Sequence, residues 1–246
     1  MKKSIGYILF FLFSNFYALM ANNTNQSENY CFSELRTAIL EEPIDLKKAR
    51  KILREIRTGG GIELIDSLIN FKEILVITSK ESRYVRNHRD TPSKIITDIA
   101  ATITYLNLGL HNNIPNSEKC TILMNELEKK LNQGKVIDAE ISILYENATS
   151  YAPCLLKIFD TTENNQILNF IAISLRGSDY PNLEEELLKR MDKHLDDVLL
   201  FGRLTVVLTT IGTDISIKKL EKIYQKSDNE DVKEYICRAI DIIEKK

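Results

Sequence analysis

Apolar residues in the last fifty positions of the chain lie on one face of three short predicted helices. They recur at intervals of three and four residues, the spacing at which side chains share one side of an α-helix. These positions are Leu200, Leu204, Val207, Leu208 and Ile211, then Ile217, Leu220, Ile223 and Tyr224, then Val232, Ile236, Ala239, Ile240 and Ile243. Residues that favour turns or helix N-caps separate the helices at 212–214 and 227–231. A helix pair this short cannot bury its own apolar face, so the pattern predicts stacked neighbours.

The same pattern extends towards the N-terminus and predicts an all-α chain. Helices are expected over 33–42, 45–57, 62–77, 93–111, 115–131, 135–147, 165–175 and 182–195. Pro153 is expected in the first turn of a further helix, where its missing N–H is tolerated. Residues 22–30 are polar and without periodicity, so they are expected to form a flexible lead-in. Nine glycines, five prolines and no tryptophan argue against a β-sandwich or a β-barrel, which need frequent turn residues.

A repeat period emerges from the breaks between helices. Two Asp-Val helix starts, at 197–198 and 231–232, lie 34 residues apart, and Gly177 and Gly212 lie 35 residues apart. Spacing of this size is typical of helix-pair repeats. On these residues the chain resembles the HEAT and armadillo-type repeat proteins.

The resemblance to HEAT and armadillo-type repeats covers residues 93–246 and departs from the family pattern around 145–159. It implies a right-handed α-solenoid, a superhelix of stacked antiparallel helix pairs with a partner-binding surface, and it implies no catalytic residues. The expected organisation is a single helical-repeat domain over 31–246. Within it, N-terminal helices span 31–77, a basic connecting segment spans 78–92, and the HEAT-like repeats follow.

The first 21 residues have the features of a secretory signal peptide. Lys2 and Lys3 precede an apolar run over 5–13, and small residues near Ala21 offer a cleavage site. An uncleaved membrane anchor over 5–21 is the alternative, although it would be at the short limit for a spanning helix. The expected location is periplasmic or secreted, in a bacterial envelope, with no membrane insertion after signal cleavage.

Four cysteines follow the predicted signal peptide, at Cys31, Cys120, Cys154 and Cys237. In an exported protein they permit two disulfides, and the sequence does not resolve which of three pairings forms. Cys120 and Cys154 lie 34 residues apart, near the starts of predicted helices in adjacent repeats, and are the favoured pair. A bond between neighbouring helices requires a local close approach of the two backbones, and buried free thiols are the main alternative.

Two charged groups are the candidate partner-binding residues. One is basic and the other acidic, and they comprise Arg83, Tyr84, Arg86, His88 and Arg89, and Glu184, Glu185, Asp192 and Asp196. Arginines in the basic group could bind a carboxylate-rich or phosphorylated surface through paired hydrogen bonds. Each group could instead be a solvated surface, with the arginines bridging to acidic helices of the same chain.

The sequence indicates no cofactor, metal site or catalytic set. The histidines His88, His111 and His194 lie far apart, and no Gly-x-Ser-x-Gly turn is present. A net charge of −2 provides no general attraction to nucleic acid. The leading hypothesis is a non-enzymatic exported protein that binds a protein partner, for example as an immunity or inhibitor protein or an envelope adaptor. The alternatives are an enzyme that combines residues 83–94 with the acidic helix 184–197, and a carrier of an apolar ligand.

Overall fold

The structure, a computed structural model, describes residues 26–40, 45–59, 61–81 and 90–246, and these residues form helices and connecting turns. They contain twelve α-helices, one 3-10 helix and no strand, which confirms the predicted all-α class. The predicted signal peptide, residues 1–21, lies outside the described residues. Contacts divide the chain into two compact units, 1–106 and 107–246, which are described separately. The single domain expected over 31–246 stays a prediction.

The first unit is a cluster of helices around one apolar core. Its elements are α2 (Gln26–Leu40), α3 (Leu46–Gly59), η1 (Ile62–Leu64), α4 (Ile65–Glu81) and α5 (Asp90–Asn107). The rings of Phe32 and Phe71 meet edge to face at 5.7 Å, and Arg50 Nε lies 2.7 Å from Asp98 Oδ2. The aromatic contact therefore links α2 to α4, and the ion pair links α3 to α5. Helix α2 begins at Gln26, inside the polar stretch expected to be a lead-in.

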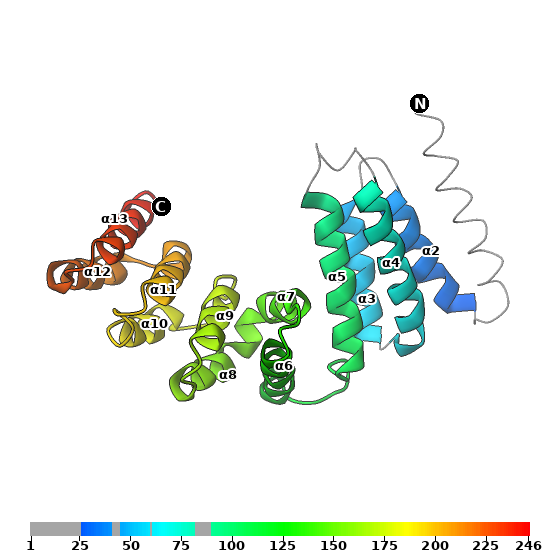
Figure 1. Cartoon of the computed structure of the whole chain (residues 1–246), viewed down its shortest axis with the longest axis horizontal. Helices are drawn as coiled ribbons and strands as arrows, with labels where there is room; N and C mark the ends of the chain where they lie inside the picture. The colour runs from blue at the N-terminus through cyan, green and yellow to red at the C-terminus, as the bar shows by residue number, and fades with distance from the viewer. Residues whose placement is uncertain (1–25, 41–44, 60, 82–89) are drawn as a thin grey trace, which may run out of the picture. The chain divides into compact units, whose positions relative to one another are not determined.

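The second unit consists of eight helices, most of which contact the second helix along the chain. They are α6 (Asn116–Asn132), α7 (Asp138–Glu146), α8 (Ala148–Thr161), α9 (Asn165–Leu175), α10 (Leu183–Met191), α11 (Val198–Ile211), α12 (Asp214–Lys226) and α13 (Glu230–Glu244). Among the odd-numbered helices, α7 contacts α9, α9 contacts α11, and α11 contacts α13. Among the even-numbered helices, α6 contacts α8 and α10 contacts α12. Figure 1 shows the odd-numbered helices in one row and the even-numbered helices in the other.

Polar side chains cap the starts of four helices in this unit, α9, α11, α12 and α13. Asp197 accepts a hydrogen bond from the backbone N–H of Leu200 at the start of α11. The Asn229 side chain accepts from the backbone N–H groups of Asp231 and Val232 at the start of α13. The Asn164 side chain accepts from those of Gln166 and Ile167 at the start of α9. Each cap satisfies backbone donors that have no partner inside the helix.

The prediction for Pro153 was wrong. The structure places it in the sixth position of α8, because that helix begins at Ala148 and not at the proline. The first turns of α8 bury Ala148, Tyr151 and Ala152 completely or nearly so. Burial of these side chains stabilises the turns ahead of the proline and offsets the hydrogen bond that its missing N–H removes.

Candidate functional site

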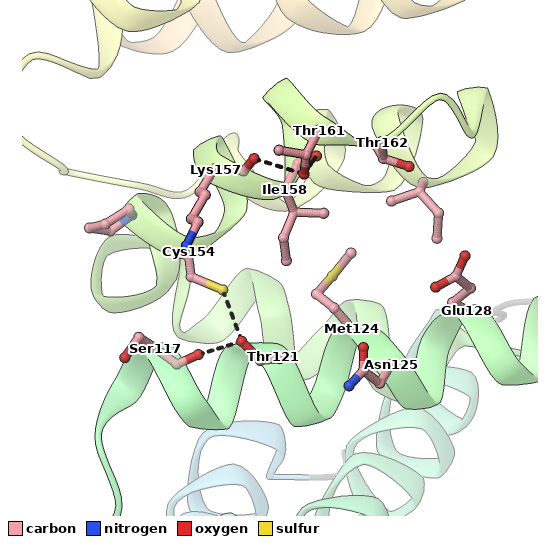
Figure 2. Close-up of a pocket in the computed structure, with 12 residues that line it drawn as sticks. Ser117, Thr121, Met124, Asn125, Glu128, Cys154, Lys157, Ile158, Thr161 and Thr162 are labelled. Carbon is pink, nitrogen blue, oxygen red and sulfur yellow. Dashed lines mark hydrogen bonds between the residues drawn. The ribbon is translucent and has the colours of Figure 1, made fainter.

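The second unit has a cleft between α6 and α8. Its volume is about 590 Å³, and Figure 2 shows the side chains around it. The apolar part of the lining includes Met124, Ile158 and Ile167, and polar side chains lie along both helices. Cleft-forming residues come from α6, α8 and the start of α9, so the cleft belongs entirely to one unit.

A disulfide between Cys120 and Cys154 joins the two helices beside this cleft, which confirms the favoured pairing. The two Cα atoms lie 6.4 Å apart, within the range that a disulfide requires. Cys237 is a free and exposed cysteine on α13. At this point α6 and α8 therefore approach each other as closely as a disulfide between neighbouring helices requires.

Hydroxyl groups in the cleft are engaged by their own helices. Thr121 Oγ1 donates to the carbonyl of Ser117, and Thr161 Oγ1 donates to the carbonyl of Lys157. Glu128 on α6 and Lys157 on α8 make no ion pair within the described residues. The lining thus combines apolar side chains with hydroxyls that bond to their own helices, one acidic side chain and one basic side chain.

Glu184, one of the predicted acidic residues, caps a neighbouring helix. Its Oε1 accepts hydrogen bonds from Ser216 Oγ at 2.6 Å and from the backbone N–H of Thr213 at 2.8 Å. It also accepts from Thr213 Oγ1 and from the backbone N–H of Ser216. Burial raises the pKa of Glu184, but these hydrogen bonds outweigh burial and hold the pKa below its ordinary value of 4.5. The carboxylate thus joins α10 to the N-terminus of α12.

Replacing Glu184 by alanine is expected to lower the free energy of unfolding by about 1–2 kcal/mol at neutral pH, because the hydrogen bonds that its carboxylate accepts at the start of α12 are lost. A carboxyl whose folded-state pKa is depressed stabilises the protein above its unfolded-state pKa, and this contribution disappears as the pH falls through the folded-state pKa. The difference between wild type and Glu184→Ala should therefore shrink as the pH falls below 4.5. Urea unfolding followed by circular dichroism at several pH values measures it.

The matched control for this prediction is Glu185→Ala. The Glu185 side chain is 67% exposed and, among the described residues, pairs with Lys189, one turn further along the same helix. An exposed pair of this kind contributes little, about 0–1 kcal/mol. Equal losses for the two variants at all pH values would contradict the role assigned to Glu184.

The other acidic candidates are largely compensated within the chain. Asp192, directly after the last residue of α10, pairs with Lys219 on α12, and Glu185 pairs with Lys189. Asp196 is exposed and makes no such contact with described residues. Glu184 and Asp192 therefore connect α10 to α12, whereas Glu185 pairs within its own helix. The role of these residues towards a partner stays a prediction.

The basic candidates Arg83, Tyr84, Arg86, His88 and Arg89 lie outside the described residues. Of the other histidines, His194 packs edge to face against Phe159 at 5.3 Å, and burial lowers its pKa. Across the described part of the chain, no three histidine, cysteine or acidic residues are grouped closely enough to hold a metal ion.

The structure also exposes a surface that sequence reasoning missed. Leu199 and Val206 of α11 are 55% and 37% exposed, and Arg203 lies between them on the same side of the helix. The available signal was that α11 carries apolar residues outside its core-facing positions. An amphipathic surface helix would have polar residues there.

Within the described residues, no helix combines the length and the apolar character that crossing a lipid bilayer would require. Comparisons with protein-family models, with characterised proteins and with solved structures give no match to this chain. The resemblance to HEAT and armadillo-type repeats accordingly stays a prediction from the helical period.

Proposed function

We propose that this protein is an exported, non-enzymatic α-solenoid that binds a protein partner. The observation that supports it most is the contact pattern of the second unit. Each of α9 and α11 contacts an odd-numbered helix on either side and an even-numbered helix beneath. This leaves one helix face open, as in repeat proteins that bind partners along a row of helices. The right-handed HEAT-like superhelix belongs to this proposal.

Export is supported by the disulfide and by the pattern of the first 21 residues. Structural disulfides persist in oxidising compartments and are rare in the cytosol. If residues 1–21 are a signal peptide, mass spectrometry of the protein purified from its host envelope should find a chain that begins near residue 22. An intact N-terminus in that fraction would contradict cleavage.

The binding function is tested by affinity purification of the tagged, disulfide-bonded protein from an envelope extract, followed by mass spectrometry. A partner whose recovery saturates, and which untagged protein displaces, would support the proposal. Recovery of no saturable partner would contradict it. An immunity or inhibitor protein and an envelope adaptor are two concrete forms of the function, and the identity of the partner distinguishes them.

The two alternative functions have less support. An enzyme built from residues 83–94 and 184–197 would need free acidic groups, whereas Glu184 and Asp192 are engaged with α12. A carrier of an apolar ligand would use the α6–α8 cleft, which is open and carries polar side chains along both helices. Saturable binding of a fatty acid there would favour the carrier.

A further inference from the structure

We infer that the partner docks on the outward face of helices α9 and α11 and presents acidic residues around exposed apolar side chains. This surface, termed the α9–α11 face, consists of Phe170, Ile173, Arg176, Leu199, Arg203 and Val206. The inference rests on the proposed function and adds the docking surface and the chemistry of the partner.

The α9–α11 face is the side that the contacts of the second unit leave uncovered. Helix α11 contacts α9 and α13 on its flanks and α10 beneath, and α9 contacts α7, α11 and α8 in the same way. On α11, Leu199, Arg203 and Val206 follow at intervals of four and three residues, which places them on one side. Phe170 and Ile173 of α9 and Arg176, directly after its last residue, follow at intervals of three residues. In Figure 1 the two helices lie next to each other in the odd-numbered row.

Apolar side chains on this face are exposed without serving the core. Leu199 and Val206 are 55% and 37% exposed, and Phe170 and Ile173 are half-buried. Contiguous exposed apolar residues rimmed by polar ones are typical of protein interaction sites. Because the core of the unit is complete without them, a partner is the remaining means of burying these side chains.

Two tyrosines border the face and rest on glycine backbones. A Cβ atom at Gly202 of α11 would lie 2.7 Å from the ring of Tyr235, and one at Gly177 would lie 3.0 Å from the ring of Tyr145. Because glycine has no side chain, each tyrosine ring can lie directly on the backbone at that glycine. Tyr145 remains 48% exposed. Aromatic side chains held in this way provide contact area at low entropic cost, and tyrosine and arginine are enriched among the residues that dominate binding energy.

The arginines determine the charge of the partner. The second unit contains four arginines, of which Arg190 pairs with Asp160 and Glu186, and Arg238 pairs with Glu234. The other two, Arg176 and Arg203, have no carboxylate partner among the described residues, and both belong to the α9–α11 face. An unpaired guanidinium beside apolar side chains complements a carboxylate, with which it can form two parallel hydrogen bonds.

A protein fits this surface better than a nucleic acid does. Binding to a phosphate backbone requires many cationic contacts, whereas the chain has a net charge of −2 and the face carries two arginines. The apolar side chains also need apolar groups to cover them, which a protein surface supplies.

The experiment uses the full disulfide-bonded chain and a synthetic amphipathic peptide with leucines on one side and glutamates on the other. Titration followed by amide chemical shifts should show saturable changes concentrated on α9 and α11, weakened by added salt. The affinity should fall roughly tenfold or more for Arg203→Glu and for Leu199→Ser. A second peptide carries lysines in place of the glutamates. Wild-type protein should bind this basic peptide no more tightly than Arg203→Glu binds the acidic peptide.

Lys222→Glu is the matched control, because Lys222 is an exposed residue of α12 and the charge change is the same. It should leave peptide affinity unchanged. Equal binding of the acidic and basic peptides, shifts centred on the α6–α8 cleft, or tighter binding of a single-stranded oligonucleotide would each overturn the inference. Analytical ultracentrifugation of the free protein tests whether a second copy of the chain occupies the face. A dimer that Leu199→Ser dissociates would show this and would overturn the inference of an acidic partner.

The inference and the proposed function fail in different ways. If a saturable partner is recovered from the envelope extract and Arg203→Glu does not weaken its binding, protein binding stands and the α9–α11 face is wrong. If wild-type protein recovers no saturable partner, the proposed function itself fails.

Discussion

Replacing Lys130 by alanine should destabilise the protein by about 3–5 kcal/mol, because it leaves a buried carboxylate without a counter-charge. Glu140 of α7 has a fully buried side chain, and its Oε1 lies 2.5 Å from Nζ of Lys130 on α6. Glu140 Oε2 has no hydrogen-bond partner among the described residues. The ammonium group is therefore the main compensation for a charge that burial has removed from water. Urea unfolding followed by circular dichroism measures the loss.

Two variants separate this effect from a general loss of lysine. Lys129→Ala removes the side chain of the preceding lysine, which pairs with Glu126. This surface pair should contribute only about 0–1 kcal/mol to the free energy of unfolding. The double variant Lys130→Met/Glu140→Leu removes both charges and should recover most of the stability lost in Lys130→Ala. Similar unfolding midpoints for Lys129→Ala and Lys130→Ala would show that the buried pair has no special role.

The buried pair also shows where the sequence misleads. In the helix expected over 135–147, Ile137, Ile141 and Leu144 have the spacing of one apolar face, but the structure buries Ile137, Glu140, Ile143 and Leu144. A glutamate in an amphipathic helix is normally assigned to solvent. Only the position of Lys130, on the preceding helix, explains why a charge occupies a core position here.

Regular helix pairs were predictable because local signals agree with the packing. The range expected for α9, 165–175, matches the observed Asn165–Leu175. The residue at the predicted helix start 197 and residue 229 of the predicted turn segment are both N-caps. Local signals conflicted at α8, where the proline suggested a later start than burial of Tyr151 and its neighbours imposes. Short apolar periods with capping residues thus fixed most of the helices of the second unit.

Candidate site residues were harder to predict because their partners lie about one repeat away in sequence. Glu184 accepts from Ser216, 32 residues further on, and Asp192 pairs with Lys219, 27 residues further on. From the sequence alone, a run of acidic residues is assigned to solvent, because the partners on the next helix pair are not visible in the local pattern. The exposure of Leu199 and Val206 likewise follows from which side of α11 its three neighbours cover.

Removing the disulfide with Cys120→Ala/Cys154→Ala is expected to lower the free energy of unfolding by about 3 kcal/mol, since the bridge closes a loop with a sequence separation of 34. Reduction of wild-type protein by dithiothreitol should produce a similar loss. Cys237→Ser should change little, because that thiol is exposed and free. Wild-type protein whose unfolding midpoint is unaffected by dithiothreitol would contradict the prediction.

The loss should be largest at α6, and hydrogen exchange can locate it. Within the second unit the main contacts of α6 are with α7 and α8, so it lacks the further flank that α9 and α11 have. The bridge to Cys154 is the covalent tie that holds this end helix in place. Without it, amides of α6 should lose protection while those of α11 retain theirs, because local opening begins where fewest contacts must break. Since a reducing compartment would remove the same tie, protein produced in the cytosol should show this pattern and protein exported to the envelope should not.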